Sequence, residues 1–343
     1  MTYYIGIDLG QQFSFFVIKD SKGIIHQKMK IANDAAAIKA ALKPFLTQPC
    51  QAVMEATTNY YWMHQTLQQL GCKAILAHPL KTRAIADAKV KNDRIDASIL
   101  ADLLRANLIP QSYIPNEDIR TLREITRQHI RLTQIRTQIK NQCHALLVKL
   151  NLRPSERLTD LFGLKGMDWL RGLPLPDVFE FQKAQLLDQI QYYNRLIREC
   201  DQKMIRMLER FPQSEVLKRI PGIGSLGAAM LIAEIGSIER FPSPKQLVGY
   251  AGIQPGLYES GKTHHARAIT HEGNGYLRWI LCEMTQIHIR KPGPLRSFYL
   301  RLKDKKGHGK ALVAAARKFL IRIYYVLKDR RSFYPELAEY ARA

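Results

Sequence analysis

The first third of the chain alternates apolar and polar positions with the period of two that is typical of β-strands. Three such segments follow one another at residues 3–9, 13–19 and 24–31, and the turn Asp20-Ser21-Lys22-Gly23 separates the second from the third. The pattern then changes to helices and strands in alternation. It predicts helices at 34–47, 59–70 and 80–107 and strands at 52–57 and 73–78.

This order, three strands and then alternating helices and strands, is that of the RNase H-like fold. In that fold the first strand, the fourth strand and a late helix meet at one metal-binding site. We therefore expect an α/β domain at the beginning of the chain, followed by mainly α-helical segments.

Two long helices with continuous apolar stripes are predicted in the middle of the chain, at 117–150 and 182–211. In the second helix the apolar positions follow steps of four and three, which is the seam of a coiled coil. Such seams pair within one chain or between chains, and the periodicity does not choose between them. A linker with two prolines at 109–118 and an irregular segment at 151–181 flank the first helix. The stripes consist of Leu132, Ile135, Ile139, Cys143, Leu146 and Leu150 in the first helix and of Leu186, Ile190, Tyr193, Ile197, Cys200, Met204, Met207 and Phe211 in the second.

The last third begins with the turn Ile220-Pro221-Gly222-Ile223-Gly224, which precedes an apolar helix. This is the turn of a helix-hairpin-helix, whose glycines let backbone N–H groups approach a phosphate while the next helix adds a favourable dipole. A plain corner between two helices is the competing interpretation. After the turn we expect a helix at 243–251, a loop from Gln254 to Gly275 and helices at 275–290 and 308–328.

The chain of 343 residues is long enough for several domains. We divide it into an α/β domain at 1–109, a helical coiled-coil linker at 110–211 and a mainly helical C-terminal domain at 212–343. Its 52 lysines and arginines against 30 acids give a formal net charge of +22. An excess of this size indicates a polyanionic partner.

Membrane association and secretion are not expected. No run of the sequence approaches the roughly 20 apolar residues that span a bilayer, and no signal region precedes the first strand. The five scattered cysteines form no CxxC pair, which is typical of buried thiols in a reducing compartment. We therefore expect a cytoplasmic protein without disulfides or zinc.

Four acidic residues stand where carboxylates would converge. Asp8 lies near the end of the first predicted strand and Glu55 near the end of the fourth, while Asp93 and Asp96 share one face of a predicted helix. Converging carboxylates repel one another unless a cation joins them, and hard oxygen ligands suit Mg²⁺ or Mn²⁺. Two such ions can clamp the attacking and leaving oxygens of a phosphodiester. The four acids are therefore the candidate catalytic and metal-binding residues.

These acids also have competing interpretations. The segment from Ile5 to Gly10, which contains Asp8, is similar to the phosphate loop of actin-like ATPases. However, a second glycine-rich phosphate loop is missing from the sequence, and the net charge does not fit that superfamily. Asp93 and Asp96, taken alone, are typical of the solvated face of a helix. The four positions taken together favour the metal site.

A stripe of arginines is predicted on one face of the helix at 117–150. In a chain of this charge it is a candidate nucleic-acid-binding surface, and a solvated helix face is the competing interpretation. The stripe consists of Arg120, Arg123, Arg127 and Arg131. Gly222, Gly224, Lys262, Arg267 and Arg278 of the C-terminal domain complete the candidate nucleic-acid-binding residues.

Seven segments, which together span most of the chain, resemble those of a known family. The chain is similar to the DEDD transposases of insertion sequences whose recombinases are guided by a bridging RNA, a family to which the pilin-gene invertase Piv is related. The segments, in the family's order, are Tyr4-Ile5-Gly6-Ile7-Asp8, Met54-Glu55-Ala56-Thr57, Lys91-Asn92-Asp93-Arg94-Ile95-Asp96-Ala97, Ile220-Pro221-Gly222-Ile223-Gly224, Leu247-Val248-Gly249-Tyr250-Ala251-Gly252, Tyr258-Glu259-Ser260-Gly261-Lys262 and Ile269-Thr270-His271-Glu272-Gly273-Asn274-Gly275-Tyr276-Leu277-Arg278.

The resemblance implies an N-terminal RuvC-like domain, a coiled-coil linker and a C-terminal transposase domain. It places the four candidate acids on the family's metal-binding positions. The family carries a nucleophilic serine in a motif of the form Ile-Ser-Lys-x-Gly-Asn, and here Thr270 stands at that position. A threonine hydroxyl attacks only when its proton is removed or its anion stabilised, which a metal ion or the adjacent His271 can do. Ser260 is the alternative nucleophile.

The resemblance further implies a bacterial site-specific DNA recombinase or transposase of an insertion sequence, which cuts and rejoins strands by Mg²⁺- or Mn²⁺-dependent phosphoryl transfer. Its expected partners are donor and target DNA, a structured non-coding guide RNA and further copies of the chain in a dimer or tetramer. It would associate with the nucleoid during the reaction.

Two other functions fit the same residues. One is a RuvC-like, structure-selective nuclease, which hydrolyses DNA and never forms a covalent link to it. The other is a nucleic-acid-binding protein without catalytic activity. Trapping a protein–DNA adduct distinguishes the first from a recombinase, and a metal titration tests the second.

Overall fold

The computed structural model describes residues 2–85, 93–155, 158–260, 263–269, 272–329 and 333, with the backbone alone at 93, 257–260 and 263–268. The chain consists of two compact units, Met1–Ile114 and Pro115–Ala343. The boundary between them falls inside the predicted linker at 109–118. The further division at residue 211 stays a prediction.

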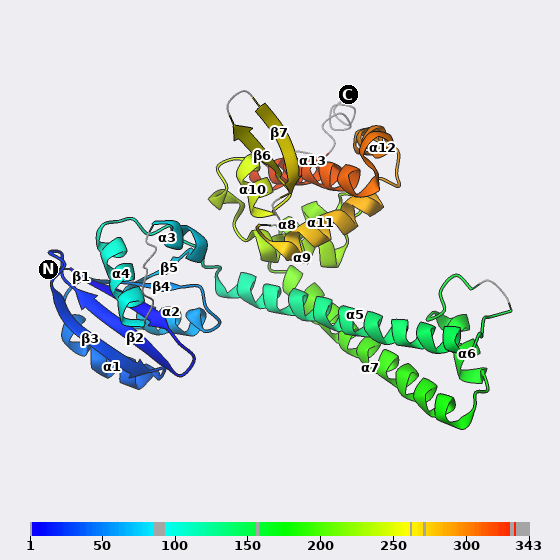
Figure 1. Ribbon diagram of the computed structural model, residues 1–343, viewed down its shortest axis with the longest axis horizontal. Helices are drawn as coiled ribbons and strands as arrows, with labels where there is room; N and C mark the ends of the chain where they lie inside the picture. Colours follow the sequence, from blue (N-terminus) through cyan, green and yellow to red (C-terminus); the bar gives the residue numbers. More distant parts are fainter. Residues whose placement is uncertain are drawn as a thin grey trace. The chain divides into compact units, whose positions relative to one another are not determined.

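A five-stranded mixed sheet forms the centre of the first unit (Figure 1). The strand β1 pairs antiparallel with β2, which pairs antiparallel with β3; on its other side β1 pairs parallel with β4, and β4 with β5. All five predicted strands are confirmed, to within two residues at each end. The strands are β1 (Tyr3–Leu9), β2 (Phe13–Lys19), β3 (Ile25–Ala32), β4 (Cys50–Glu55) and β5 (Lys73–Ala77).

Helices cover both faces of this sheet. On one face, Ile5 and Ile7 of β1 pack in a core with Ile38 and Met63, which come from α1 and α2. On the other face, Val53 of β4 packs in a core with α4. The predicted helix at 80–107 is two helices in the described residues, α3 and α4. The helical elements of the unit are α1 (Ala35–Leu42), the 3₁₀ turn η1 (Lys43–Phe45), α2 (Tyr60–Gln69), α3 (Pro79–Ile85) and α4 (Asp93–Arg105).

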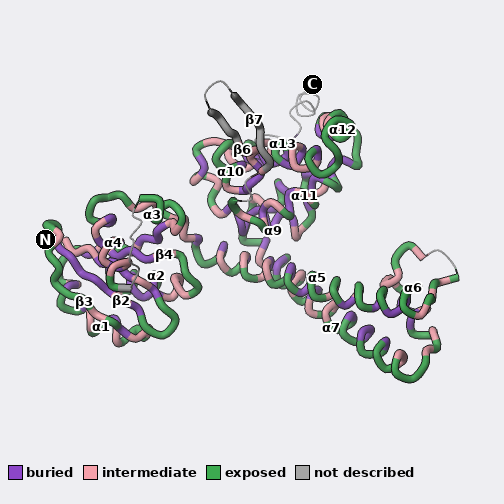
Figure 2. Tube along the Cα trace, viewed as in Figure 1, coloured by how far each residue is buried: buried purple, intermediate pink, exposed green. Residues whose placement is uncertain are grey.

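The second unit begins with a long antiparallel helical hairpin of α5 (Glu117–Lys149) and α7 (Asp177–Leu208). Buried residues lie on the facing sides of the two helices (Figure 2). Every position of the stripe predicted for 182–211 is buried or half-buried, and the two helices pair within the chain. A supercoiled geometry and pairing between chains stay predictions.

One member of the stripe predicted in α5 does not face its partner. Ile135 is 37% exposed, whereas the next residue, Arg136, donates a hydrogen bond from Nη1 to Asn194 Oδ1 of α7 at 2.8 Å. The position of Ile135 in the buried stripe was therefore wrong, and the next residue, Arg136, contacts α7 instead.

The segment predicted as irregular, 151–181, contains the helix α6 (Leu164–Gly172). Met167 and Leu170 of α6 pack in one core with Leu146 of α5 and Leu186 of α7, at the end of the hairpin where the two long helices are joined. Burial against this end, and not local propensity, stabilises a short helix with two glycines.

The helix α9 (Ser225–Ile235) lies in the core of the rest of this unit and is buried from Gly227 to Ile235. The predicted loop at 254–275 instead contains a two-stranded hairpin of β6 (Pro255–Ser260) and β7 (Thr263–Ile269). None of the described helices is long and apolar enough to cross a membrane. The other elements are α8 (Gln213–Lys218), the 3₁₀ turn η2 (Ile238–Arg240), α10 (Pro244–Tyr250), α11 (Gly275–His288), α12 (Pro294–Lys306) and α13 (His308–Asp329).

Candidate active site

Asp8 and Glu55 stand at the carboxyl ends of two neighbouring parallel strands. Ile7 of β1 is in register with Met54 of β4, so the next residues of the two strands, Asp8 and Glu55, fall at the same edge of the sheet. Side chains alternate along a strand, and Glu55 therefore shares its face with Val53, which packs against α4. Both carboxylates are half-buried on the α4 side of the sheet.

The helix α4 crosses β1 in direct backbone contact. A Cβ added to Gly6 would lie 1.9 Å from the carbonyl oxygen of Ala97 and 2.6 Å from the amide nitrogen of Ala101. A glycine at position 6 is therefore required, since any side chain there would push the helix off the sheet. Gly6 and Asp8 lie on the same face of β1, so the helix that covers Gly6 also approaches Asp8.

Two contacts fix the direction of α4. At the amino end of β1, Lys19 donates hydrogen bonds from Nζ to Asp102 Oδ2 at 2.5 Å and to the carbonyl oxygen of Ser98 at 3.2 Å. At the other end, the guanidinium carbon of Arg94 lies 5.7 Å from the centre of the Phe15 ring, and Phe15 is in register with Asp8. The amino end of α4 therefore lies over the carboxyl end of β1.

This arrangement puts three of the four predicted acids at the same end of the sheet. Asp8 and Glu55 come from the strand ends, and Asp96 comes from the first turn of α4. Asp93 begins that helix, and its side chain lies outside the described set.

The loops behind the strand ends are tied together by asparagine side chains. Asn59, which precedes α2, donates a hydrogen bond from Nδ2 to the carbonyl oxygen of Gly10 at 2.9 Å. Asn33 donates to the same oxygen at 2.9 Å and to that of Gln11 at 3.1 Å. The backbone after Asp8 is thus fixed against the backbone after Glu55.

The donor set is chemically suited to a divalent cation. It consists of carboxylates alone, which are the ligands of Mg²⁺ and Mn²⁺. Among the residues whose side chains are described, no three acids, histidines or cysteines lie close enough together to hold a metal ion, and Asp93 is outside that search. The described acids therefore suit such a site by type, but Asp8, Glu55 and Asp96 do not by themselves lie close enough to hold an ion.

The predicted arginine stripe is divided between two environments. Arg127 donates from Nε and Nη2 to Glu234 at 2.9 Å each, and Arg123 donates from Nε and Nη2 to the carbonyl oxygen of Ala233 at 3.0 and 2.8 Å. The donors of these two arginines are thus directed at α9 of the same unit. Arg131 is exposed, and its guanidinium contacts Gln128 of its own helix. Arg120 lies on the same helix, and its side chain also interacts with another group of the protein.

The predicted phosphate-binding turn connects α8 to α9. Gly222 has a φ of 94°, and a Cβ there would lie 2.7 Å from the carbonyl oxygen of Met284 in α11. Gly224 is the N-cap of α9, and nothing lies within 4 Å of the position its Cβ would take. The first glycine is therefore needed for packing, and the second leaves the helix end open to a ligand.

The remaining predicted residues lie between positions 260 and 278 of the sequence. Thr270, His271 and Lys262 lie outside the described residues, as do the side chains of Arg267 and Ser260. Arg278 of α11 approaches Gly252, where a Cβ would lie 2.6 Å from Nη1 of this arginine. Thus the structure tests neither the nucleophile nor the alternative to it.

A strongly basic surface at the junction of α12 and α13 was missed from the sequence. Lys303, Lys305, Lys306 and Lys310 are exposed there, around Gly307. Close by, Lys318 Nζ lies 4.0 Å from the centre of the Phe298 ring. The density of lysines between two helices was the available signal, and the predicted helix at 308–328 contained only part of it.

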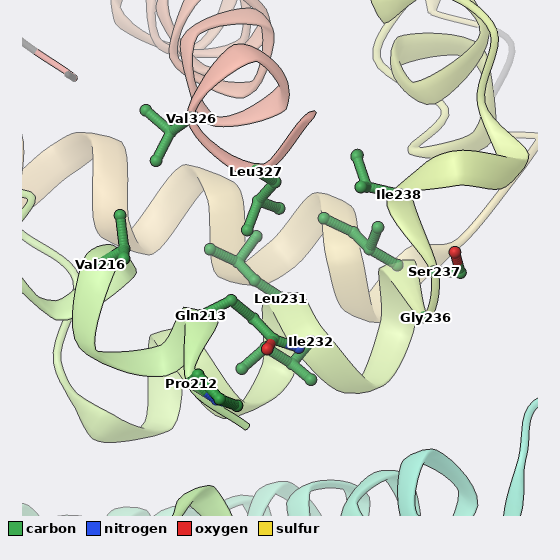
Figure 3. A pocket seen from close by; sticks show the side chains of 11 residues that line it. Pro212, Gln213, Val216, Leu231, Ile232, Gly236, Ser237, Ile238, Val326 and Leu327 are labelled. Atoms are coloured by element: carbon green, nitrogen blue, oxygen red, sulfur yellow. The ribbon is translucent and has the colours of Figure 1, made fainter. Parts of the chain in front are cut away.

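A hollow of about 620 Å³ lies between α8, α9 and α13 (Figure 3). Its lining is mainly aliphatic and includes Val216, Leu231, Ile238 and Val326. It offers no carboxylate or histidine, so it does not fit the chemistry of strand cleavage.

Comparisons with known proteins match both parts of the chain. A DEDD transposase model of the IS110 type matches residues 5–152, which include all four candidate acids. A second model, the transposase IS116/IS110/IS902 family, matches residues 214–300, which include Glu234 and the segment 269–274.

Curated relatives extend along most of the chain. The transposase for insertion sequence element IS1328 of Yersinia enterocolitica is 23% identical over 84% of this chain and 84% of its own length. The transposase for insertion sequence element IS1111A of Coxiella burnetii is 24% identical over 82% of this chain and 78% of its own length. The chain therefore carries both domains of IS110-type transposases, in order, and is similar to insertion-sequence transposases along most of its length.

Proposed function

We propose that this transposase cuts and rejoins DNA strands by metal-dependent phosphoryl transfer. The observation that supports this most directly is the placement of the amino end of α4 over the ends of β1 and β4, which gathers Asp8, Glu55 and Asp96 at one edge of the sheet. Asp8, Glu55, Asp93 and Asp96 would hold Mg²⁺ or Mn²⁺. The bound ions would stabilise the charge that develops on the transferred phosphate.

The hydroxyl of Thr270 is the proposed attacking group. A bond would form between Oγ1 and the phosphorus, and the bond between phosphorus and the leaving DNA oxygen would break. The proton of Thr270 would leave with a base, for which the adjacent His271 is available, and the leaving oxygen would take up a proton. The family resemblance further suggests that the acids of one protomer act with the hydroxyl of another, in a dimer or tetramer.

Nucleic acid would be held mainly through its phosphates. The net charge of +22 supports this. Arg120 and Arg131, the open N-terminus of α9 at Gly224 and the basic surface at the junction of α12 and α13 are the proposed contacts. Lys262, Arg267 and Arg278 stay proposed contacts beside the hydroxyl motif. A structured guide RNA is proposed from the family resemblance, as the partner of the first unit and the long hairpin.

Replacing Asp8 by asparagine tests the metal site. The change keeps the size of the side chain and removes one negative ligand, so strand cleavage should disappear while DNA binding persists. The measurements are cleavage of labelled DNA from the ends of the insertion sequence, and binding of the same DNA by gel shift, at increasing Mn²⁺ concentration. Asp20→Asn is the matched control, since Asp20 is buried at the other end of the sheet and hydrogen-bonded to His26. Wild-type cleavage by Asp8→Asn would show that the acids are not the catalytic ligands.

A further inference from the structure

A fully buried carboxylate lies at the carboxyl end of α9, next to the C-terminal motif. Glu234 is 0% exposed. It accepts two hydrogen bonds from Arg127 at 2.9 Å each and one from Asn274 Nδ2 at 2.7 Å. Arg123 Nε lies 3.6 Å from its Oε2. Three elements, α5, α9 and the start of α11, therefore meet at one side chain.

This carboxylate is not needed to fill the core. The rest of the buried part of α9 is apolar or glycine, and a buried ionic group is often less stabilising than a hydrophobic residue of the same volume. Burial alone would lower the pKa of the Arg127 guanidinium, yet the hydrogen bonds and the charge of Glu234 raise it above its ordinary value. Arg127 is thus held in its charged form, and its two parallel hydrogen bonds to Glu234 define one geometry.

Asn274 has a fixed orientation because both ends of its amide are engaged. Its Oδ1 accepts a hydrogen bond from the backbone N–H of Leu277 at 3.0 Å, which caps α11. Its Nδ2 donates to Glu234 and also to the hydroxyl oxygen of Tyr250 at 3.2 Å. Its backbone N–H donates to the carbonyl oxygen of Tyr250 at 2.8 Å.

The residues just before Asn274 are packed against the turn after α10. Gly273 has a φ of 113°, and a Cβ there would lie 2.7 Å from the carbonyl oxygen of Tyr250. Gly252 has a φ of 67°, and a Cβ there would lie 2.2 Å from the carbonyl oxygen of Glu272. Only glycine tolerates these conformations and these distances without strain.

We propose that Glu234 and Asn274 are positioning residues, which fix the carboxyl end of the segment 269–274 against α5 and α9 so that its hydroxyl meets the phosphate in a single geometry. The proposal rests on the proposed function, in which that segment carries the nucleophile. Neither residue contacts DNA in this role. Because α5 continues from the linker after the first unit, the anchor also connects the C-terminal motif to the helix that leads away from the acids.

The test uses the full-length chain with Asn274→Asp. This change preserves size and the helix cap, because aspartate is as good an N-cap as asparagine. It removes the N–H donors and sets a second carboxylate against Glu234. We expect an unchanged DNA affinity, a thermal midpoint lowered by the two facing carboxylates, faster hydrogen exchange in peptides covering 272–276, and at least about a tenfold loss of covalent DNA adduct, since small displacements of a reacting group lower rates by up to about 10²-fold.

Two further variants keep the test decisive. Asn274→Ser retains the cap but is too short to reach Glu234, and it replaces Asn274→Asp if the latter does not fold. In the double variant with Asn274→Asp and Glu234→Gln, the new amide can donate to the new carboxylate, and one negative charge remains beside Arg127. This exchange of donor and acceptor should restore adduct formation, which a purely structural role for the pair does not predict.

Two results would overturn the proposal: an adduct yield of Asn274→Asp or Asn274→Ser equal to wild type, or a loss of yield without any change in hydrogen exchange. Failure of the double variant to recover would also overturn it. If the wild type itself forms no adduct, the proposed nucleophile is refuted instead. Hydrogen exchange would then still show whether Glu234 and Asn274 anchor the segment.

Discussion

The residue proposed as the nucleophile, Thr270, carries its hydroxyl on a branched carbon. The γ-methyl of Thr270 restricts χ1 and adds bulk near an in-line attack, whereas serine has neither restriction. Threonine in place of serine keeps the proposed attacking hydroxyl and changes how easily the side chain adopts a reactive rotamer. Substitution of this one residue measures the effect.

Thr270→Ala should abolish covalent adduct, because it removes the attacking oxygen, and Thr270→Ser should retain or increase it. The measurement is denaturing electrophoresis of labelled DNA after reaction, followed by mass spectrometry of the modified peptide. Ser260→Ala is the control and should change the yield little. An adduct on Ser260, or one that persists in Thr270→Ala, would identify another nucleophile; no adduct from any form would favour hydrolysis.

Residue patterns predicted the strands that carry two of the acids, and they did not predict the anchor. Asp8 and Glu55 lie near the ends of strands whose apolar alternation is clear, so their place at one edge of the sheet followed from the fold. Glu234 lies in an apolar helix without a motif, and its partners come from more than a hundred residues earlier and forty later. Arg123 and Arg127 were predicted to bind nucleic acid, with a solvated helix face as the alternative, because spacing does not show what packs against a helix.

At the scale of elements, the sequence pattern predicted those helices and strands that short-range interactions stabilise. The long helices and the strands of the sheet were found from periodicity, whereas α6, α12 and the β6–β7 hairpin were missed. The hairpin contains two adjacent histidines and an arginine instead of a regular apolar alternation, and α6 is held by the end of the α5–α7 hairpin. Such elements owe their stability to tertiary contacts that no short window contains.

The turn between α8 and α9 is supported from behind by the end of α11. His288 donates a hydrogen bond from Nδ1 to the carbonyl oxygen of Pro221 at 2.6 Å, and its ring centre lies 4.9 Å from that of Phe319. Burial lowers the pKa of His288, and the charges of Arg322 and Lys291 lower it further, against the opposing effect of the hydrogen bond. The neutral ring is therefore the form that supports the turn.

A histidine whose folded pKa is depressed binds its proton more readily in the unfolded chain. Its contribution to stability is complete above its ordinary pKa and is lost as the pH falls from there toward the folded pKa. The thermal midpoint of the wild type should therefore decrease as the pH is lowered from 7 to 5. The midpoint of His288→Asn, which keeps an N–H donor without titrating, should decrease less steeply. Equal slopes by scanning calorimetry would show that His288 is not responsible.

At the scale of the whole molecule, the positive charge is concentrated in places that the net figure does not reveal. Part of it neutralises Glu234 inside the second unit, and part is exposed around Gly307. Only the exposed part can release counterions from DNA. The affinity for DNA should therefore depend on where the exposed lysines lie and not on the total net charge of the chain.

Replacing Lys305, Lys306 and Lys310 by glutamine should weaken DNA binding and reduce its dependence on salt. Each lost phosphate contact lowers the slope of log affinity against log salt by about 0.9 on duplex DNA, so the triple change should lower it by up to about 2.7. The matched control replaces Lys22, Lys28 and Lys39, which are exposed on the first unit, and removes the same net charge. Equal slopes for the two triple variants, measured by fluorescence anisotropy, would contradict a local DNA contact.

The contact between Gly6 and Ala97 has a consequence for synthesis of the protein. The strands that carry Asp8 and Glu55 precede α4 in the sequence and leave the ribosome before it. Until α4 packs on the backbone of Gly6, Asp96 is not held beside those strands. A chain that ends before α4 therefore lacks two of the acids of the proposed metal site.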